Sequence, residues 1–175
     1  MKYFTNEVLE TGKDFERICG LYREQLKGLR ALVSKQAWEF FYLGFGRWGL
    51  HDASILRFSA GDGLNYLADG RTPFRINKRR TAVEIQILNR HQNLLYTFAC
   101  NSVRKIVFDY APDDPPMGWK AIDDINTYEL TSGSKAPLSL EFLFVSEATI
   151  LVEFARLKFS RRRVRRQYDS SEAYA

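Results

Sequence analysis

The hydrophobic period of this chain changes once, near residues 44–49, and that change is the strongest constraint on its fold. In residues 14–33 apolar side chains recur every three or four positions, which is the spacing of one face of an α-helix. After residue 53 apolar and polar side chains alternate instead, as they do in half-buried strands. Helices followed by a run of antiparallel strands predict an α+β domain.

The pattern predicts helices over residues 14–33 and 34–43, with Ser34 as the N-cap of the second helix. It predicts strands over residues 54–60, 64–68, 81–88, 94–98, 104–110, 125–131, 138–145 and 149–159. Residues 111–118 contain three prolines and are expected to form a surface loop. We therefore expect N-terminal helices packed on a twisted antiparallel sheet or a half-open β-barrel of about six to eight strands.

The positive charge of the chain is concentrated at its C-terminal end. Net charge is +5 over 175 residues, and residues 156–175 hold seven basic and two acidic side chains, so the rest of the chain is neutral. A hydrophobic fraction of 45% excludes intrinsic disorder. We expect one α+β domain over residues 1–160 and a basic tail over residues 161–175.

The apolar segments and the cysteines indicate a compartment. Glu7 and Glu10 interrupt the N-terminal region before any stretch typical of a signal peptide, and no uncharged apolar run approaches the roughly 20 residues that span a bilayer. Cys19 and Cys100 lack the spacing of a metal site or a disulfide framework, so we expect buried, reduced thiols. The sequence predicts a cytoplasmic protein without a membrane span.

Two motifs resemble ligand sites but lack the required context. Residues 44–49 match GxGxxG, yet a helix precedes them and a strand follows, which is the reverse of a dinucleotide-binding turn. His51 and Asp52 resemble a metal-binding dyad, but His91 is the only other histidine. We expect His51 and Asp52 to bind backbone groups between helix and sheet. The sequence predicts no catalytic residue, metal or cofactor, although a magnesium site made of carboxylates alone stays open.

An acidic segment with a central tryptophan is a candidate contact surface for a protein partner. Its residues are Asp113, Asp114, Trp119, Asp123 and Asp124. A tryptophan surrounded by charges is typical of an interface hot spot with a polar rim. General acid and base catalysis by the paired carboxylates is the alternative.

Five arginines form the second candidate contact site: Arg161, Arg162, Arg163, Arg165 and Arg166. Guanidinium groups pair with phosphates or carboxylates, so the tail is suited to nucleic acid or to an acidic protein surface. A third interpretation is a solvated terminus that prevents edge-to-edge pairing of sheets. The residues alone leave these three open.

The hexapeptide Leu50-His51-Asp52-Ala53-Ser54-Ile55 resembles an LHDxxI signature found in a group of small bacterial families of unknown function. In these families a helix precedes the signature and a β-rich domain follows, and the resemblance covers roughly residues 10–160. Some of them are thought to include immunity proteins, which neutralise toxins delivered between neighbouring bacteria. The resemblance implies a cytoplasmic protein that occludes a toxin encoded nearby, and the arginine-rich tail departs from the family pattern.

We therefore expect a non-enzymatic protein-binding module, with a toxin as the partner that the resemblance implies. The alternative is a nucleic-acid-associated accessory protein that uses the arginine-rich tail. An enzyme that depends on His51 is the third interpretation. The oligomeric state and the identity of the partner are left open by the sequence.

Overall fold

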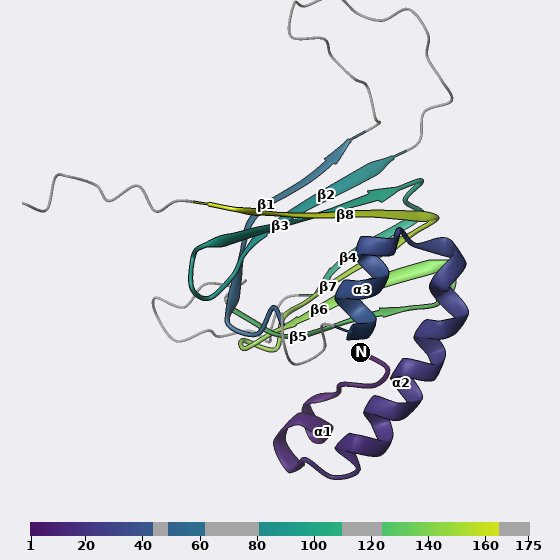
Figure 1. Cartoon of the computed structure of the whole chain (residues 1–175), viewed down its shortest axis with the longest axis vertical. Helices are drawn as coiled ribbons and strands as arrows, with labels where there is room; N and C mark the ends of the chain where they lie inside the picture. The colour runs from purple at the N-terminus through teal and green to yellow at the C-terminus, as the bar shows by residue number, and fades with distance from the viewer. Residues whose placement is uncertain (44–48, 62–80, 110–123, 165–175) are drawn as a thin grey trace, which may run out of the picture.

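The computed structural model describes residues 1–43, 49–61, 81–109 and 124–164 (Figure 1). The helices in these ranges are α1 (Asn6–Thr11), α2 (Phe15–Leu29), a 3₁₀ turn (Arg30–Leu32) and α3 (Lys35–Leu43). The strands are β1 (Ala53–Gly61), β2 (Ala82–Leu88), β3 (Leu94–Asn101), β4 (Lys105–Asp109), β5 (Asp124–Thr131), β6 (Leu138–Phe144), β7 (Thr149–Phe154) and β8 (Arg156–Arg163).

The strands form one open, eight-stranded antiparallel sheet in the order β4-β7-β6-β5-β1-β2-β3-β8. The pairing of β1 with β5 is short, because only Ala53 and Ser54 are in register with β5. Beyond that junction the sheet separates into two layers, β1-β2-β3-β8 and β4-β7-β6-β5, as Figure 1 shows. The α+β class and the antiparallel sheet are confirmed.

The two longer helices bury the faces that their apolar spacing predicts. α2 buries Tyr22, Leu26 and Leu29, and the backbone N–H of Leu130 on β5 donates to the Tyr22 hydroxyl at 2.9 Å. α3 begins where expected, because the Ser34 hydroxyl accepts a hydrogen bond from the backbone N–H of Ala37 at 3.2 Å. α1 was not predicted from the hydrophobic period, and it buries no side chain completely.

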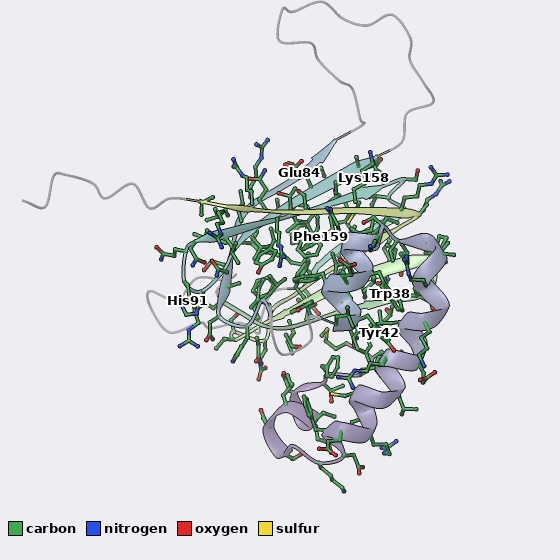
Figure 2. The ribbon with its side chains drawn as sticks, in the orientation of Figure 1. Trp38, Tyr42, Glu84, His91, Lys158 and Phe159 are labelled. Atoms are coloured by element: carbon green, nitrogen blue, oxygen red, sulfur yellow. The ribbon has the colours of Figure 1, made fainter. Side chains whose placement is uncertain are left out.

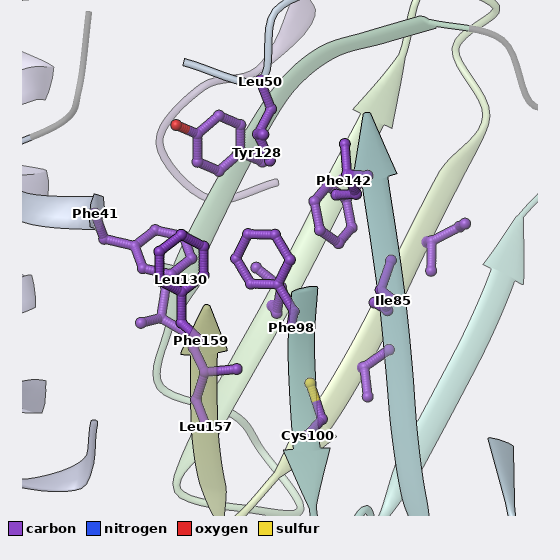
Figure 3. Packing of buried hydrophobic residues seen from close by; sticks show 14 of the residues in the cluster. Phe41, Leu50, Ile85, Phe98, Cys100, Tyr128, Leu130, Phe142, Leu157 and Phe159 are labelled. Atoms are coloured by element: carbon purple, nitrogen blue, oxygen red, sulfur yellow. The ribbon is translucent and has the colours of Figure 1, made fainter. Parts of the chain in front are cut away.

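Aromatic side chains of α3 join the two layers of the sheet. The Phe40 ring lies 4.6 Å from the ring centroid of Phe159 on β8 and 5.6 Å from that of Tyr128 on β5. Phe98 on β3 meets Phe142 on β6 edge to face, with ring centroids 6.1 Å apart. Figure 3 labels both rings. Ring pairs at these separations add to the gain from burying their area. Helix α3 is therefore held between β8 and β5.

The single strand predicted over residues 149–159 is wrong, because the chain forms two strands there. β7 pairs with β6 and β4, whereas β8 pairs with β3 in the other layer. Ala155 separates them, and its N–H donates to the Asn101 carbonyl at 3.0 Å. The chain passes from one layer to the other at Ala155. The alternation of apolar and polar residues continues on both sides of this position, and no proline or glycine indicates the break.

Other strand predictions agree with the structure within a few residues. Val83, Ile85 and Ile87 are buried on β2, as the alternation predicts, and residues 89–93 form the turn to β3. The strand predicted over residues 64–68 and the proline-rich loop over residues 111–118 lie outside the described residues.

Candidate interaction surface

Strand β8 carries three of the five arginines that the sequence assigned to a tail. Arg161, Arg162 and Arg163 are its last three residues and lie in register with β3, so the strand runs past the predicted start of the tail at residue 161. Leu157 and Phe159 are buried, and the other six side chains of β8 are exposed. The apolar pair anchors the strand to the core, and the basic side chains remain in solvent.

A groove of about 470 Å³ lies between α3 and β8. Helix α3 lines it with residues spaced by three and four, and β8 lines it with three consecutive residues: Gln36, Glu39, Phe40 and Leu43, then Phe159, Ser160 and Arg161. That helical spacing places the α3 residues on one stripe. We call this set of seven residues the α3–β8 groove.

The groove has an apolar floor and a polar rim. Phe40 and Phe159 form the floor and are almost fully buried, whereas Leu43 is 65% exposed. Glu39 and Arg161 place opposite charges on its two sides. A buried aromatic floor beside an exposed aliphatic side chain and charged groups is the composition of a protein-interface core with its rim.

Arg161 influences the tyrosine opposite it in the sheet. Burial raises the pKa of Tyr96 above its ordinary value, and the charge of Arg161, its cross-strand neighbour, opposes that shift. On the helix side the Glu39 carboxylate lies 3.8 Å from the Lys35 ammonium. The groove therefore has a basic strand on one side and a screened acid on the other.

A second set of side chains lies on the flank of α3 away from the groove. The Trp38 and Tyr42 rings stack with centroids 4.5 Å apart and planes at 14°. The Arg30 guanidinium carbon lies 5.4 Å from the Trp38 ring centroid. Figure 2 labels both rings on α3 and Phe159 on β8. Tryptophan, tyrosine and arginine are the residue types most enriched in interface hot spots.

The outer face of the β2-β3-β8 layer is mixed in charge and has small side chains near β8. Cross-strand neighbours there include Lys158, Ala99 and Glu84 in one row, with Ser160 and Thr97 in the adjacent row. Figure 2 labels Glu84 on β2 and Lys158 on β8, the two strands on either side of β3. These two rows provide no aromatic ring on which a nucleic-acid base could stack.

The structure separates Asp124, the one described residue of the acidic segment, from the basic strand β8. Asp124 is the first residue of β5 and accepts a hydrogen bond from the Ser54 hydroxyl at 2.8 Å. In the strand order, β1, β2 and β3 lie between β5 and β8, so Asp124 and the basic strand belong to different layers. The remaining predicted contact residues lie outside the described residues: Asp113, Asp114, Trp119, Asp123, Arg165 and Arg166.

His51 and Asp52 lie in a turn before β1, at the end of the sheet where β2 and β3 are joined. The Asp52 carboxylate pairs with the Arg90 guanidinium at 3.0 Å, and His51 is exposed, with its Nδ1 3.6 Å from Asp52. Asp52 has a φ of 59° and donates its backbone N–H to the Ile125 carbonyl. Among the described residues, the Asp52 carboxylate is paired with the Arg90 guanidinium, whereas contacts with backbone groups were expected.

Two buried acids were missed by the sequence reasoning. Backbone N–H groups of Lys2 and Tyr3 donate to Glu129, and burial raises the pKa of Glu129 above its ordinary value although these bonds oppose the shift. Glu153 accepts hydrogen bonds from the Lys135 N–H and the Ser134 hydroxyl. A lone acid among apolar strand residues was the signal available in the sequence. Both carboxylates are occupied by donors that fix chain segments.

Thiols and metal ligands provide no reactive cluster in the described ranges. Burial raises the pKa of the Cys100 thiol, which disfavours the reactive thiolate, and Cys19 is half-buried. Within residues 1–43, 49–61, 81–109 and 124–164, no three His, Cys, Asp or Glu side chains are grouped as a metal site would require. In the same ranges, every helix is too short or too polar to cross a membrane.

Sequence missed the groove because it is formed by two elements that are far apart in the chain. Its helical stripe could have been read from the spacing of Gln36, Glu39, Phe40 and Leu43, but the strand that faces it could not. Compared with protein families, curated proteins and solved structures, the chain has no significant match. The resemblance to immunity families therefore stays a prediction.

Proposed function

We propose that this chain is a non-enzymatic protein-binding module whose contact site is centred on the α3–β8 groove. The observation that carries the proposal is the junction of an exposed leucine and a buried aromatic floor with the basic edge strand β8. The Trp38–Tyr42 stack extends the same helix surface on its other flank. Together these features supply apolar anchors and a charged rim.

The surroundings of the titratable groups support a binding role. Glu129 and Glu153 hold backbone segments, and Asp52 holds Arg90, so their carboxylates act as structural acceptors. A catalytic acid or base is instead expected in a cleft beside a reacting group. The α3–β8 groove offers Glu39 and Arg161 as its charged side chains, which suit recognition.

The partner that we propose is a toxin encoded by the neighbouring gene, on the basis of the LHDxxI resemblance. The module would act by covering the toxin's active surface. The test is to purify the chain and the adjacent gene product, measure their co-elution, and assay the toxin with saturating chain. Full toxin activity in a saturating amount of this protein would overturn the immunity proposal.

A matched pair of exposed leucines tests the location of the contact. Leu43 lies in the groove, and Leu21 lies on α2 with 49% of its surface exposed. We expect Leu43→Glu to weaken partner binding by about tenfold or more, because it places a charge in an apolar contact, and Leu21→Glu to change the Kd by less than about twofold. Equal effects of the two variants, measured by calorimetry, would place the contact elsewhere.

A further inference from the structure

We propose that a basic groove at the connections between the two sheet layers binds an acidic segment of the protein partner. The chain passes between the layers twice at this end of the sheet, from β3 to β4 and from β7 to β8. The inference rests on the proposed protein-binding function, and it specifies the charge of what is bound and a contact region beyond the α3–β8 groove.

The two connections lie side by side and are joined by backbone hydrogen bonds. The Ala155 N–H donates to the Asn101 carbonyl at 3.0 Å, and the Arg104 N–H donates to the Glu153 carbonyl at 2.8 Å. Each bond links the β3–β4 connection to the end of β7 or to the residue that follows it. The side chains that these segments carry are therefore held at fixed positions relative to one another.

A groove lies on each side of the paired connections. Their volumes are about 520 Å³ and about 680 Å³, and Ser102 and Ala155 line both of them. Each groove is lined by two basic residues: Arg104 and Lys135 in the first, and Arg156 and Lys158 in the second. We call the two grooves together, with these four basic residues, the crossover groove.

The crossover groove is adjacent to the α3–β8 groove on both of the elements that they share. On β8 its lining ends at Lys158, and the lining of the α3–β8 groove begins at Phe159. On the helix side it includes Ser34, and the α3–β8 groove begins at Gln36. A partner seated in the α3–β8 groove would therefore lie next to the basic side chains.

The four basic side chains are available to a partner. All four residues are exposed, and among the described residues none of the four forms an ion pair. The nearby acid is Glu153, which is buried, lies 3.8 Å from the Lys105 ammonium and accepts a hydrogen bond from the Lys135 backbone. Unpaired cations around a groove attract an anionic partner and disfavour a basic one.

The remaining lining favours an acidic peptide over nucleic acid. Leu32, Val103 and Pro137 add aliphatic surface, and Leu32 is 39% exposed. The described residues that line the two grooves include no aromatic ring on which a base could stack. Guanidinium groups pair with carboxylates in a bidentate geometry. A segment that mixes acidic and aliphatic side chains matches both parts of this surface.

The experiment uses the full chain and a capped eight-residue peptide in which glutamate and valine alternate, with binding measured by calorimetry. The test variant combines Lys135→Glu with Arg156→Glu, one change in each groove. The control variant combines Lys13→Glu with Arg23→Glu, which changes the net charge equally at two exposed residues outside the described lining. Thermal unfolding of both variants checks that the fold is retained.

We expect the test variant to bind the acidic peptide about tenfold more weakly than the wild type, because several weak exposed ion pairs are lost together, and the control variant to differ by less than about twofold. A second peptide, with lysine in place of glutamate, should bind the test variant more tightly than it binds the wild type. Amide shifts in ¹⁵N NMR spectra should be largest at residues 102–104 and 155–158.

Three outcomes would overturn the proposal. The first is equal weakening in the test and control variants, which would indicate attraction by net charge alone. The second is preferential binding of a five-nucleotide oligothymidine, whose four phosphates match the charge of the acidic peptide. The third is equal binding of the partner protein by the wild type and the test variant while Leu43→Glu weakens it. That result would retain the proposed protein-binding function and exclude the acidic segment.

Discussion

Within the described residues, the sheet ends at two edge strands, β4 and β8, which differ in how they close it. β4 has five residues, and its Phe108 ring packs against Phe58 of β1 at 4.8 Å. β8 has eight residues and is bridged on its outer side by Val33 at Leu157. Short edges and charged edges are both means by which proteins prevent unwanted pairing of strands. The comparison teaches that β4 is protected by its brevity, whereas β8 is protected by its charge.

The largest difference that we expect between the edges is in their contribution to stability. Phe159→Ala on β8 should lower the free energy of unfolding by about 3 to 5 kcal/mol, because it leaves a cavity between Phe40, Phe98 and Tyr96. Phe108→Ala on β4 should cost roughly 1 kcal/mol, since that side chain is 39% exposed. Urea unfolding measures both. If Phe108→Ala lowered the free energy of unfolding more than Phe159→Ala, the expectation that β8 contributes more to the core than β4 would be wrong.

A smaller effect is expected from prolines at adjacent positions of β8. The Val164 N–H donates to the Asn93 carbonyl, and hydrogen-bonded pairs alternate along an antiparallel ladder, so Arg162→Pro removes an N–H that points toward β3 and Arg163→Pro removes one that points outward. We expect Arg162→Pro to be less stable than Arg163→Pro by about 1 kcal/mol, the net value of a typical hydrogen bond. Both variants lose one arginine, so charge is matched. Equal unfolding midpoints and slopes would contradict the orientation of the strand.

The smallest expected effect is a dependence on pH at the β4 side. Burial raises the pKa of Glu153, but the hydrogen bonds from Lys135 and Ser134 and the charge of Lys105 outweigh it, so the pKa lies below its ordinary value of 4.5. The stability that this carboxylate provides is complete above pH 4.5 and is lost as pH falls through the lowered pKa. Stability relative to Glu153→Gln should therefore decrease in acid.

Glu129 provides a control of opposite sign for that measurement. Burial raises its pKa, so its ionised form costs stability near neutral pH, and that cost is relieved as pH falls through the raised pKa toward 4.5. Stability relative to Glu129→Gln should increase over that range. Urea unfolding of the wild type and both variants at several pH values gives the two difference curves. Parallel curves would show that neither carboxylate titrates as its environment indicates.

Local sequence patterns predicted the helices and strands that bury one face and expose the other. Ser34 marks the start of α3, and the alternation of Val83, Ile85 and Ile87 gives β2, because capping and periodicity act over a few residues. The strand over residues 149–159 was predicted as one element, since no proline or glycine interrupts it. Its division at Ala155 depends on which strands lie beside each part.

At the candidate site, too, local sequence patterns failed to predict which residues form a strand. Arg161, Arg162 and Arg163 were predicted to lie in a tail because their charge gives no reason for burial. They form a strand because Leu157 and Phe159 fix the preceding residues in the core, and β3 then offers unpaired backbone groups in register. Four residues of α3 line a groove only because β8 is placed beside them: Gln36, Glu39, Phe40 and Leu43.

The sequence by itself determined the α+β class, the order of helices before strands, and the location of the positive charge near the C-terminal end. These properties depend on hydrophobic period and on composition, which are local. Only the tertiary structure decided that the basic residues form an edge strand and that this strand lies beside α3. It also decided that Phe40 and Phe159 form an apolar floor between the two elements. Strand partners are selected by long-range burial and register, and neither quantity is contained in any single segment of the chain.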